Sequence, residues 1–332
     1  MTFNTTRAVQ RIMSSLGAAF VLSIGLNTSA IAQTGGYAKG TVKLIVTNAP
    51  GTAPDAIGRA LTQGLQDIRG LPTIVETKVG VQGMLGGDFV VRSTPDGSAL
   101  ILGSDTLTTV LPHMPEKMSF DPLKDLRPIA LVADAAYVLV ANPSLKVKTL
   151  AEFVKAAKEK PGAIDYASTG VNSAHNRTMV QFMKVADIKL NHIPYGSTGP
   201  LPDVLGGTIP VMWSGLAGAL AHIQSGKLVA LAVSSAKRHP SMPNVATVAE
   251  LGYPGFDEGN WFGVMAPAGM PDALASTIQK DILKIVDTPA FRDRMTLQGM
   301  TAHPGNQEAF IKLIQTDYAR NKGRINVDPA TK

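Results

Sequence analysis

Six segments that follow predicted strands have a composition suited to holding an anion. They are rich in Gly, Ser, Thr and Asn, and they contain no Lys or Arg. In open α/β sheets a ligand sits outside the carboxyl ends of the strands. Segments of this kind offer it backbone N–H groups and hydroxyls rather than full charges. They are residues 48–55, 80–83, 104–109, 168–176, 194–199 and 214–218.

These segments, together with the two tryptophans, supply the candidate ligand-binding residues. They are Asn48, Gly51, Thr52, Asp55, Val81, Gln82, Ser104, Asp105, Thr106, Ser168, Thr169, Gly170, Asn172, Ser173, His175, Tyr195, Gly196, Ser197, Thr198, Trp213, Ser214 and Trp261.

Several of these segments lead directly into predicted helices. Helix N-termini bind anions through unpaired N–H groups and the positive end of the dipole. Residues 168–176 are the first choice for such a site, with 194–199 second, and a carboxylate fits the chemistry. The alternative is that both are ordinary Gly/Ser turns with local hydrogen bonds, and spacing does not decide between the two.

Three other candidates have a structural and a binding interpretation. Asp55 and Arg59 stand four apart at the start of a predicted helix, where an ion pair would stabilise the helix. Ligand contact is the second interpretation of Asp55. Trp213 and Trp261 follow strands, and each can either line a cleft or fill a domain core.

Signatures of catalysis and of cofactor binding are missing. Residues 80–86 have glycines three apart and fail the G-x-G-x-x-G spacing, and the chain has no P-loop, G-x-S-x-G or H-E-x-x-H motif. The six histidines include no pair at metal-ligand spacing. We therefore expect no cofactor, no metal and no catalytic residue. A hydrolase or isomerase using His175 with Ser173 or Asp105 is the alternative from another class.

The elements that would position these segments alternate along the chain. Apolar runs of four to six residues alternate with stretches of helical periodicity, which predicts βα units around a largely parallel sheet. Strands are expected at 42–47, 73–77, 99–102, 137–141, 164–167, 190–193, 209–212, 230–233 and 262–266. Helices are expected from about 54, at 86–92, 149–160, 174–186, 200–206, 216–225, 271–286, 289–298 and 306–320.

Composition and the N-terminus indicate an exported protein. Arg7 and Arg11 precede an uncharged apolar stretch, and residues 30–32 have the small-x-small pattern of a signal peptidase site, so residues 1–32 are a predicted signal peptide cleaved after Ala32. Its loss lowers the net charge from +6 to +4 because it holds two Arg and no acids. Basic residues are scattered, which speaks against nucleic-acid binding. With no Cys, the fold depends on burial alone.

Read in order, the motifs of the chain resemble those of the Bug receptors, the extracytoplasmic solute-binding proteins of tripartite tricarboxylate transporters. The resemblance covers essentially the whole mature chain. It rests on Ala49-Pro50-Gly51 with Asp55 and Arg59, Ser93-Thr94-Pro95-Asp96-Gly97, Phe120-Asp121-Pro122-Leu123-Lys124-Asp125-Leu126, Asn142-Pro143-Ser144, Tyr166-Ala167-Ser168, His192-Ile193-Pro194-Tyr195, Asp203-Val204-Leu205-Gly206-Gly207, Ser225-Gly226-Lys227-Leu228 and Trp261-Phe262-Gly263.

This resemblance implies a two-lobed Venus-flytrap periplasmic binding protein, type II-like, with two crossover strands. Residues 33–137 and 236–332 would form the first lobe and 138–235 the second. The protein would capture a small organic carboxylate in the periplasm, without catalysis, and deliver it to integral-membrane transporter subunits. We expect a monomer. A ligand-loaded co-receptor for a membrane sensor is a further alternative that the sequence does not separate from a transport receptor.

Three departures from the family pattern bear on the ligand. Thr52 replaces a glycine, Trp213-Ser214 replaces a common Phe-Asp pair, and Gly196 replaces a basic residue. These changes predict a more neutral and more aromatic pocket, and they favour an aromatic carboxylate of the benzoate or phthalate type. An amino acid stays open, because Asp55, Asp105 and Asp257 could receive its ammonium group.

Overall fold

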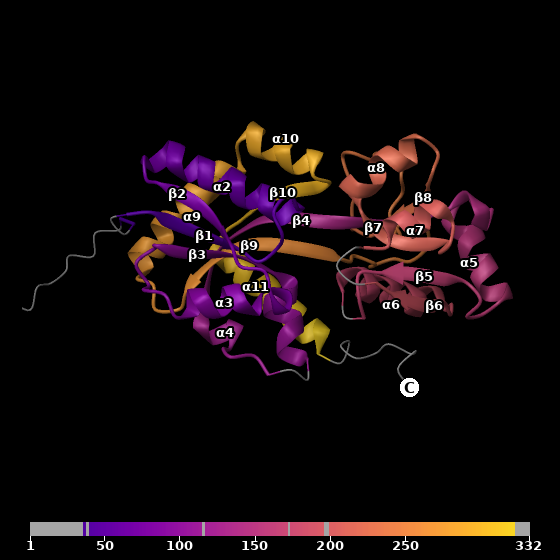
Figure 1. Cartoon of the computed structure of the whole chain (residues 1–332), viewed down its shortest axis with the longest axis horizontal. Helices are drawn as coiled ribbons and strands as arrows, with labels where there is room; N and C mark the ends of the chain where they lie inside the picture. Colours follow the sequence, from indigo (N-terminus) through magenta and orange to yellow (C-terminus); the bar gives the residue numbers. More distant parts are fainter. Residues whose placement is uncertain (1–35, 38–39, 115–116, 172, 196–198, 323–332) are drawn as a thin grey trace, which may run out of the picture. The chain divides into compact units, whose positions relative to one another are not determined.

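The computed structural model describes residues 36–37, 40–114, 117–171, 173–195 and 199–322 (Figure 1). The predicted signal peptide and its cleavage site lie outside these residues. None of the helices in the described ranges is both long enough and apolar enough to cross a membrane.

A ten-stranded sheet forms the centre of the fold. Its main path runs β2-β1-β3-β9-β4-β7-β5-β6, and two more strands, β8 and β10, also pair with β4. The strands are β1 (Val42–Val46), β2 (Thr73–Thr77), β3 (Ala99–Ser104), β4 (Leu126–Ala141), β5 (Asp165–Ser168), β6 (Asn191–Pro194), β7 (Val211–Gly215), β8 (Val229–Val233), β9 (Gly259–Pro267) and β10 (Met300–Gly305).

Strand β4 joins two groups of elements, because its partners change in its middle. Residues up to Ala136 pair with β9 and β10, whereas Tyr137 and the residues after it pair with β7 and β8. We call the β1, β2, β3, β9 and β10 side the first lobe and the β5–β8 side the second lobe (Figure 1). The change of partners falls beside the predicted boundary at 137/138, but the boundaries themselves stay a prediction.

The prediction of a largely parallel sheet is wrong for the centre of the fold. The outer pairs, β1 with β2 and β3, and β5 with β6 and β7, are parallel. Every pair that involves β4 or β9 is antiparallel. The reason is that β4 and β9 carry the chain between the lobes in opposite directions, so they cannot belong to βα units.

Helices cover both faces of the first-lobe sheet (Figure 1). On one face α2 (Ala53–Arg69), α9 (Asp272–Val286) and α10 (Pro289–Leu297) bury apolar stripes that include Ile57, Leu61 and Ile278. The other face carries α3 (Met84–Val91), α4 (Pro122–Asp125), α11 (Gln307–Asn321), and the short turns η1 (Val81–Gly83), η2 (Thr106–Val110) and η3 (Leu111–His113). This sandwich holds the ends of β1 and β3 in place.

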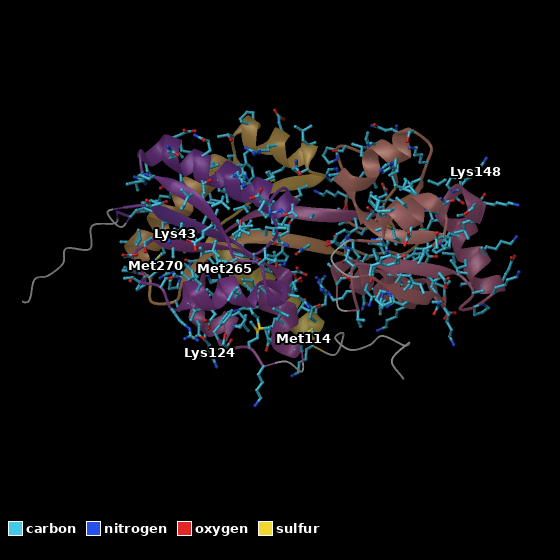
Figure 2. All side chains as sticks on the ribbon, in the orientation of Figure 1. Lys43, Met114, Lys124, Lys148, Met265 and Met270 are labelled. Atoms are coloured by element: carbon cyan, nitrogen blue, oxygen red, sulfur yellow. The ribbon has the colours of Figure 1, made fainter. Side chains whose placement is uncertain are left out.

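The second lobe repeats this arrangement on a smaller sheet. The helices α5 (Leu150–Glu159) and α6 (Ala174–Ala186) pack Phe153 and Phe182 into one core. The helices α7 (Leu201–Gly206) and α8 (Leu216–Gln224) pack Val204 and Leu216 into the other. The turn η4 (Pro143–Leu145) follows β4. Charged side chains such as Lys124 and Lys148 lie at the periphery, whereas Met265 points into the first lobe (Figure 2).

The two crossings between the lobes are tied together at Ser234. The chain crosses once along β4 and returns after β8. Ser234, fully buried, accepts the Tyr137 N–H at its hydroxyl (2.9 Å), donates its own N–H to the Tyr137 carbonyl (2.9 Å) and accepts the Glu258 N–H at its carbonyl. These bonds satisfy backbone groups where β4 exchanges partners, so the crossing is an ordered part of the fold.

Most of the predicted elements are present within a few residues of their predicted ends, but two stretches of strand were missed. The first half of β4 contains Pro128 and bulges beside it, and β10 contains Pro304 and a register shift. Proline in a run argues against a central strand. Here the bulges accommodate it, which sequence periodicity does not reveal.

A glycine-to-alanine pair tests how closely β9 packs. A Cβ on Gly263 would lie 2.2 Å from Phe310 Cζ of α11, so Gly263→Ala should lower the free energy of unfolding by about 1–3 kcal/mol through overpacking. The exposed Gly206 of α7 has nothing within 4 Å of such a Cβ, and Gly206→Ala should not destabilise the protein. Urea denaturation measures both. Equal effects of the two changes would contradict the packing argument.

Candidate functional site

A cleft of about 600 Å³ lies at the carboxyl ends of β1, β3 and β7, with walls from both lobes. It touches β4 at its point of partner exchange, through Ala135, Ala136 and Tyr137. The remaining lining residues are Thr47, Asn48, Gly51, Thr52, Ala53, Pro54, Gln82, Ser104, Thr106, His175, Gly215, Leu216, Ala217, Gly218, Asn260, Phe262, Gln298, Gly299 and Met300.

The N-terminus of α8 opens into this cleft. Its N-cap is Gly215, which has no side chain to cap the helix, and no acid stands in the first turn. Ala217 and Gly218 are exposed and line the cleft. The first amides of a helix have no intrahelical acceptor and carry the positive end of the dipole, so this end can receive an anion.

A second helix, α2, also begins at the cleft but is less suited to an anion. Its N-cap residue Thr52 makes no capping bond and donates its hydroxyl to the Ala49 carbonyl (2.6 Å). The buried carboxylate of Asp55 already occupies the first turn, where it accepts from the Gly51 N–H and from Arg59 Nε, each at 2.9 Å. Arg59 holds the pKa of Asp55 below its usual range. Asp55 therefore stabilises this helix, and α8 is the stronger anion site.

Uncharged polar groups line the rest of the first-lobe wall. Asn48, Gln82, Ser104 and Thr106 bring amides and hydroxyls to the cleft. Gln82 has φ 54° and ψ 28°, a left-handed conformation that a non-glycine residue adopts at a cost. Strained backbone conformations are often found at functional sites, and Gln82 lines the cleft.

Aromatic groups form part of the opposite wall. Tyr137 and His175 lie with ring centroids 4.6 Å apart, and Phe262 of β9 contributes a third ring from the first lobe. Burial, with a smaller contribution from Arg177, lowers the pKa of His175 to about 4. The imidazole is therefore neutral near pH 7, and no lining residue among those described carries a full charge there.

Seven of the candidates chosen from the sequence line this cleft: Asn48, Gly51, Thr52, Gln82, Ser104, Thr106 and His175. Val81 belongs to η1 beside Gln82. Asn172, Gly196, Ser197 and Thr198 lie outside the described residues. That the seven bind ligand stays a prediction.

The segment 168–176, our first choice for an anion site, is instead largely occupied with its own structure. Ser168 is buried, and its hydroxyl bonds His192 Nε2 (2.7 Å) and both backbone groups of Gly170. Ser173 caps α6 by accepting the Asn176 N–H. Thr169 contacts His175 Nδ1 at 3.1 Å. Local bonding of this kind is the alternative that the sequence had left open, and here it applies to Ser168, Gly170 and Ser173.

Other candidates also lie away from the cleft. Tyr195 donates its hydroxyl to Asp203, and the hydroxyl of the buried Ser214 bonds the Gly215 carbonyl. The hydrogen bond of His175 goes to Thr169 rather than to Ser173 or Asp105, the partners that the enzyme alternative required.

Both tryptophans fill cores. Trp213 is fully buried between Phe182 and Phe256 in the second lobe, and its Nε1 has no hydrogen-bond partner among the described residues. Trp261, 5 % exposed, packs against Phe310 and donates Nε1–H to Asp317 (2.8 Å). Neither indole lines this cleft: Trp213 lies in the second-lobe core, whereas Trp261 alternates on β9 with the lining residues Asn260 and Phe262 and lines a neighbouring hollow. That either indole contacts a ligand stays a prediction.

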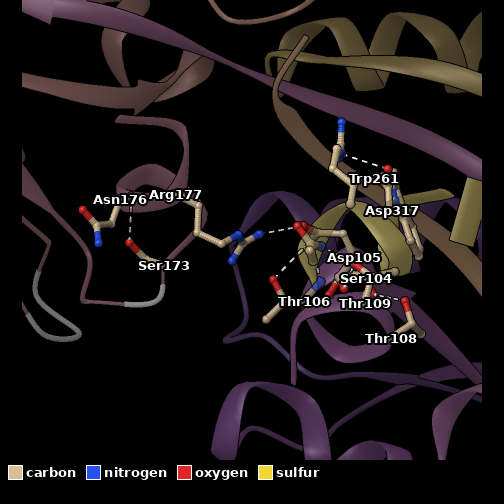
Figure 3. A network of polar contacts seen from close by, with 12 residues as sticks. Ser104, Asp105, Thr106, Thr108, Thr109, Ser173, Asn176, Arg177, Trp261 and Asp317 are labelled. Atoms are coloured by element: carbon tan, nitrogen blue, oxygen red, sulfur yellow. Dashed lines mark hydrogen bonds and ion pairs between the residues drawn. The ribbon is translucent and has the colours of Figure 1, made fainter. Parts of the chain in front are cut away.

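Sequence reasoning missed Arg177, which reaches from α6 to Asp105 of the first lobe with an Nη2 to Oδ2 distance of 2.7 Å (Figure 3). It also missed Tyr137, Gln298 and Met300, whose neighbours in sequence carry no binding signature. One signal was available for Arg177: a cation in the first turn of a helix opposes the dipole, so it calls for a tertiary partner.

Among the residues that the structure describes, no group of three or more His, Asp or Glu side chains is placed to hold a metal ion. An open helix N-terminus and neutral polar walls from both lobes are the features expected of a two-lobed α/β protein that binds a small anionic solute.

Comparison with known proteins identifies the family. The family model for the tripartite tricarboxylate transporter family receptor, TctC, matches residues 57–327. The chain is 32 % identical over 310 residues to protein BugT of Bordetella pertussis, covering 91 % of this chain and 93 % of that protein. The chain therefore belongs to the TctC family of Bug receptors, as its motifs predicted.

Solved structures agree with the fold. The periplasmic binding protein BugD matches with a TM-score of 0.73 at 27 % identity, over 86 % of this chain and 97 % of that one. MatC from Rhodopseudomonas palustris, with bound malate, matches with a TM-score of 0.73 at 25 % identity, over 87 % of this chain and all of that one. Rpa4515 of R. palustris, with adipate, shares the fold at a TM-score of 0.77 and 22 % identity, over 87 % and 97 %. The predicted two-lobed fold is confirmed.

Gln82→Gly separates strain from binding. Glycine adopts the left-handed conformation without a steric cost, so the free energy of unfolding should stay level or rise, whereas ligand affinity should fall about threefold to tenfold with the loss of the amide. Lys146→Gly, at an exposed residue with φ 57° away from the cleft, is the matched control and should leave affinity unchanged. Urea denaturation measures the free energy of unfolding, and calorimetric titration measures ligand affinity. Unchanged affinity in Gln82→Gly would show that the Gln82 side chain does not contact the ligand.

The lowered pKa of His175 predicts a pH effect on stability. Below pH 6.5 the unfolded chain binds a proton on this imidazole that the folded protein does not bind until about pH 4, so protonation favours unfolding as the pH falls through this window. Between pH 7 and pH 5, His175→Gln should lose about 1–2 kcal/mol less unfolding free energy than the unaltered protein. Urea titrations at both pH values measure this difference. Parallel losses in the two proteins would contradict a depressed pKa.

Proposed function

We propose that this protein is a solute-binding receptor that captures a small organic carboxylate in the cleft between its lobes. The observation that carries the proposal is the uncapped start of α8, which opens into the cleft with no acid in its first turn. There the ligand carboxylate accepts hydrogen bonds from amides that have no other partner in the helix.

The ligands of two structurally similar proteins support the ligand class. Rpa4515 holds adipate and MatC holds malate, both of them carboxylates. The chain resembles both proteins over more than four fifths of its length. The lining residues bear on the part of the ligand that carries this carboxylate group.

We propose an aromatic carboxylate of the benzoate or phthalate type. Tyr137, His175 and Phe262 offer ring surfaces, and Met300 adds a polarisable one. An amino acid is less suited, because the acids considered for its ammonium group have other roles: Asp55 pairs with Arg59, Asp105 pairs with Arg177, and Asp257 accepts the Ala236 N–H outside this cleft. A buried ammonium group without a partner would be costly.

The rest of the functional proposal joins the N-terminal sequence pattern to what family membership suggests. The protein is exported, loses residues 1–32 after Ala32, works in the periplasm as a monomer without turnover, and delivers its ligand to integral-membrane transporter subunits. Residues 33–137 with 236–332, and 138–235, move as the two lobes. Ligand binding shifts the population towards the closed arrangement, because only that arrangement brings both walls to the ligand.

Thermal unfolding of the ligand-free mature protein against a panel of carboxylates tests the function. A carboxylate at a hundred times its dissociation constant stabilises the folded state by about 2.7 kcal/mol, which raises the Tm by a few degrees. We expect benzoate or phthalate to raise the Tm most, aliphatic carboxylates less, and amino acids not at all.

Neutral analogues provide the control for this panel. Benzyl alcohol keeps the ring but lacks the charge, so it should leave the Tm unchanged if the start of α8 selects the carboxylate. Equal shifts with benzoate and benzyl alcohol would contradict the anion site. If no carboxylate raises the Tm, the proposed function is overturned.

A further inference from the structure

The hydroxyl of Tyr137 is an unused donor at the cleft. The side chain is 6 % exposed and lines the cleft, and its hydroxyl makes no hydrogen bond to any described residue. Over the same residues, the buried side-chain polar atoms without a partner are Asp55 Oδ1, Trp213 Nε1, His239 Nε2 and Asn260 Oδ1. The Tyr137 hydroxyl is not one of these buried atoms, so it reaches the surface of the cleft.

The imidazole beside this hydroxyl offers a second open atom. The rings of Tyr137 and His175 have centroids 4.6 Å apart, and both residues line the cleft. Thr169 Oγ1 lies 3.1 Å from Nδ1 of His175, which leaves Nε2 without a partner in the part of the chain that the structure describes. Nε2 is also not one of the buried unpartnered atoms. We call the Tyr137 hydroxyl and His175 Nε2 the polar subsite.

The register of the sheet places Tyr137 beside the start of α8. Tyr137 of β4 is the register partner of Gly215 of β7, the N-cap residue of α8. The N–H and carbonyl of Tyr137 bond Ser234 on the other side of β4, so Tyr137 and Gly215 form a non-hydrogen-bonded pair, in which facing residues come closest. A Cβ on Gly215 would meet nothing within 4 Å. The space over Gly215, next to the Tyr137 ring, is therefore open to a ligand.

The size of the tyrosine ring sets the spacing between the polar subsite and the start of α8. Side chains of a strand stand roughly perpendicular to the sheet, so the Tyr137 hydroxyl lies a ring length away from the backbone of the pair with Gly215. A ligand that reaches both places needs a spacer of similar length between its two polar groups. A benzene ring with these groups in meta or para positions provides it, whereas ortho groups lie too close together.

Both atoms of the polar subsite are uncharged near pH 7. Burial raises the pKa of the Tyr137 hydroxyl, so it keeps its proton and can donate. Burial, with a smaller contribution from Arg177, lowers the pKa of His175 to about 4, so Nε2 belongs to a neutral ring. Uncharged partners suit a neutral polar group. A hydroxyl fits either tautomer of His175, because it both donates and accepts.

We propose that the polar subsite binds a hydroxyl group of the ligand, so that the receptor selects meta- or para-hydroxybenzoate over benzoate. Tyr137 donates to the ligand oxygen, and Nε2 of His175 bonds the same hydroxyl group, while the start of α8 holds the carboxylate. This inference rests on the proposed function and narrows its ligand class to hydroxylated aromatic carboxylates.

Calorimetric titration of the unaltered mature protein is the first test. We expect the meta or the para isomer to bind about threefold to tenfold more tightly than benzoate, which is the contribution of about one hydrogen bond. The ortho isomer, whose hydroxyl adjoins the carboxylate, should bind no more tightly than benzoate. Equal affinities for benzoate and all three isomers would overturn the proposal. Tighter binding of terephthalate, with a second carboxylate in place of the hydroxyl, would overturn it as well.

Tyr137→Phe removes the hydroxyl and keeps the ring. Affinity for the preferred hydroxybenzoate should fall about threefold to tenfold, and affinity for benzoate should stay level. The free energy of unfolding should stay level or rise, because the hydroxyl has no partner in the described part of the folded chain. A merely structural hydroxyl would instead lower stability and weaken both ligands alike. A folded Tyr137→Phe protein that keeps its preference would overturn the proposal.

Tyr253→Phe is the matched control. The Tyr253 hydroxyl also lacks a hydrogen-bond partner among the residues described, and its ring packs on Phe182 with centroids 5.7 Å apart. This tyrosine packs against the second-lobe core and does not line the cleft. Its replacement should leave the preference for the hydroxylated ligand unchanged. An equal loss of preference in Tyr253→Phe and Tyr137→Phe would contradict the assignment to Tyr137.

The outcomes separate this inference from the proposed function, and the titration of the unaltered protein needs no variant to fold. Equal binding of benzoate and the hydroxybenzoates overturns the inference and leaves the carboxylate receptor standing. If only aliphatic carboxylates bind, the inference falls together with the aromatic ligand class, and the receptor still stands. If no carboxylate binds, the proposed function itself is overturned, and the inference with it.

Discussion

The hydrogen bonding of β4 is the constraint on which the rest of the structure depends. The backbone of this 16-residue strand needs hydrogen-bond partners on both sides while the strand passes from the first lobe to the second. It finds them by exchanging β9 and β10 for β7 and β8 between Ala136 and Tyr137, with Ser234 bonding the backbone at the exchange. The cleft lies at this exchange, so its walls come from the two lobes that β4 joins.

A cleft built in this way can hold an anion without a lining cation. The ends of β1 and β3 bring amides and hydroxyls, and the end of β7 leads directly into the open start of α8. Helix N–H groups are fixed by the helix itself, so they need not be reorganised when the ligand arrives. They also leave the walls neutral, which allows ring surfaces such as Tyr137 and Phe262 to share the site.

Desolvation decides which charges near the cleft matter. Arg59 reaches solvent, and its pairing with Asp55 mainly stabilises α2. Arg177 lies near the start of α6, where the dipole disfavours a cation, and in a poorly solvated position between the lobes. Asp105 of the first lobe is one of its partners there, with Oδ2 2.7 Å from Nη2 of Arg177. This ion pair links the two lobes beside residues that line the cleft.

The sequence by itself determined the elements, the family and the chemistry of the loops, because these depend on local periodicity, turn residues and motif order. Two strands of the first lobe were harder to predict: β10 and the first half of β4 contain prolines that only bulges and tertiary pairing accommodate. The tertiary structure alone decided which polar loops face the cleft. Ser168 and Thr106 look alike in sequence, yet one bonds a buried His192 and the other lines the cleft. Trp213 and Arg177 show the same limit, since the direction of a side chain and its partner far along the chain depend on packing between elements.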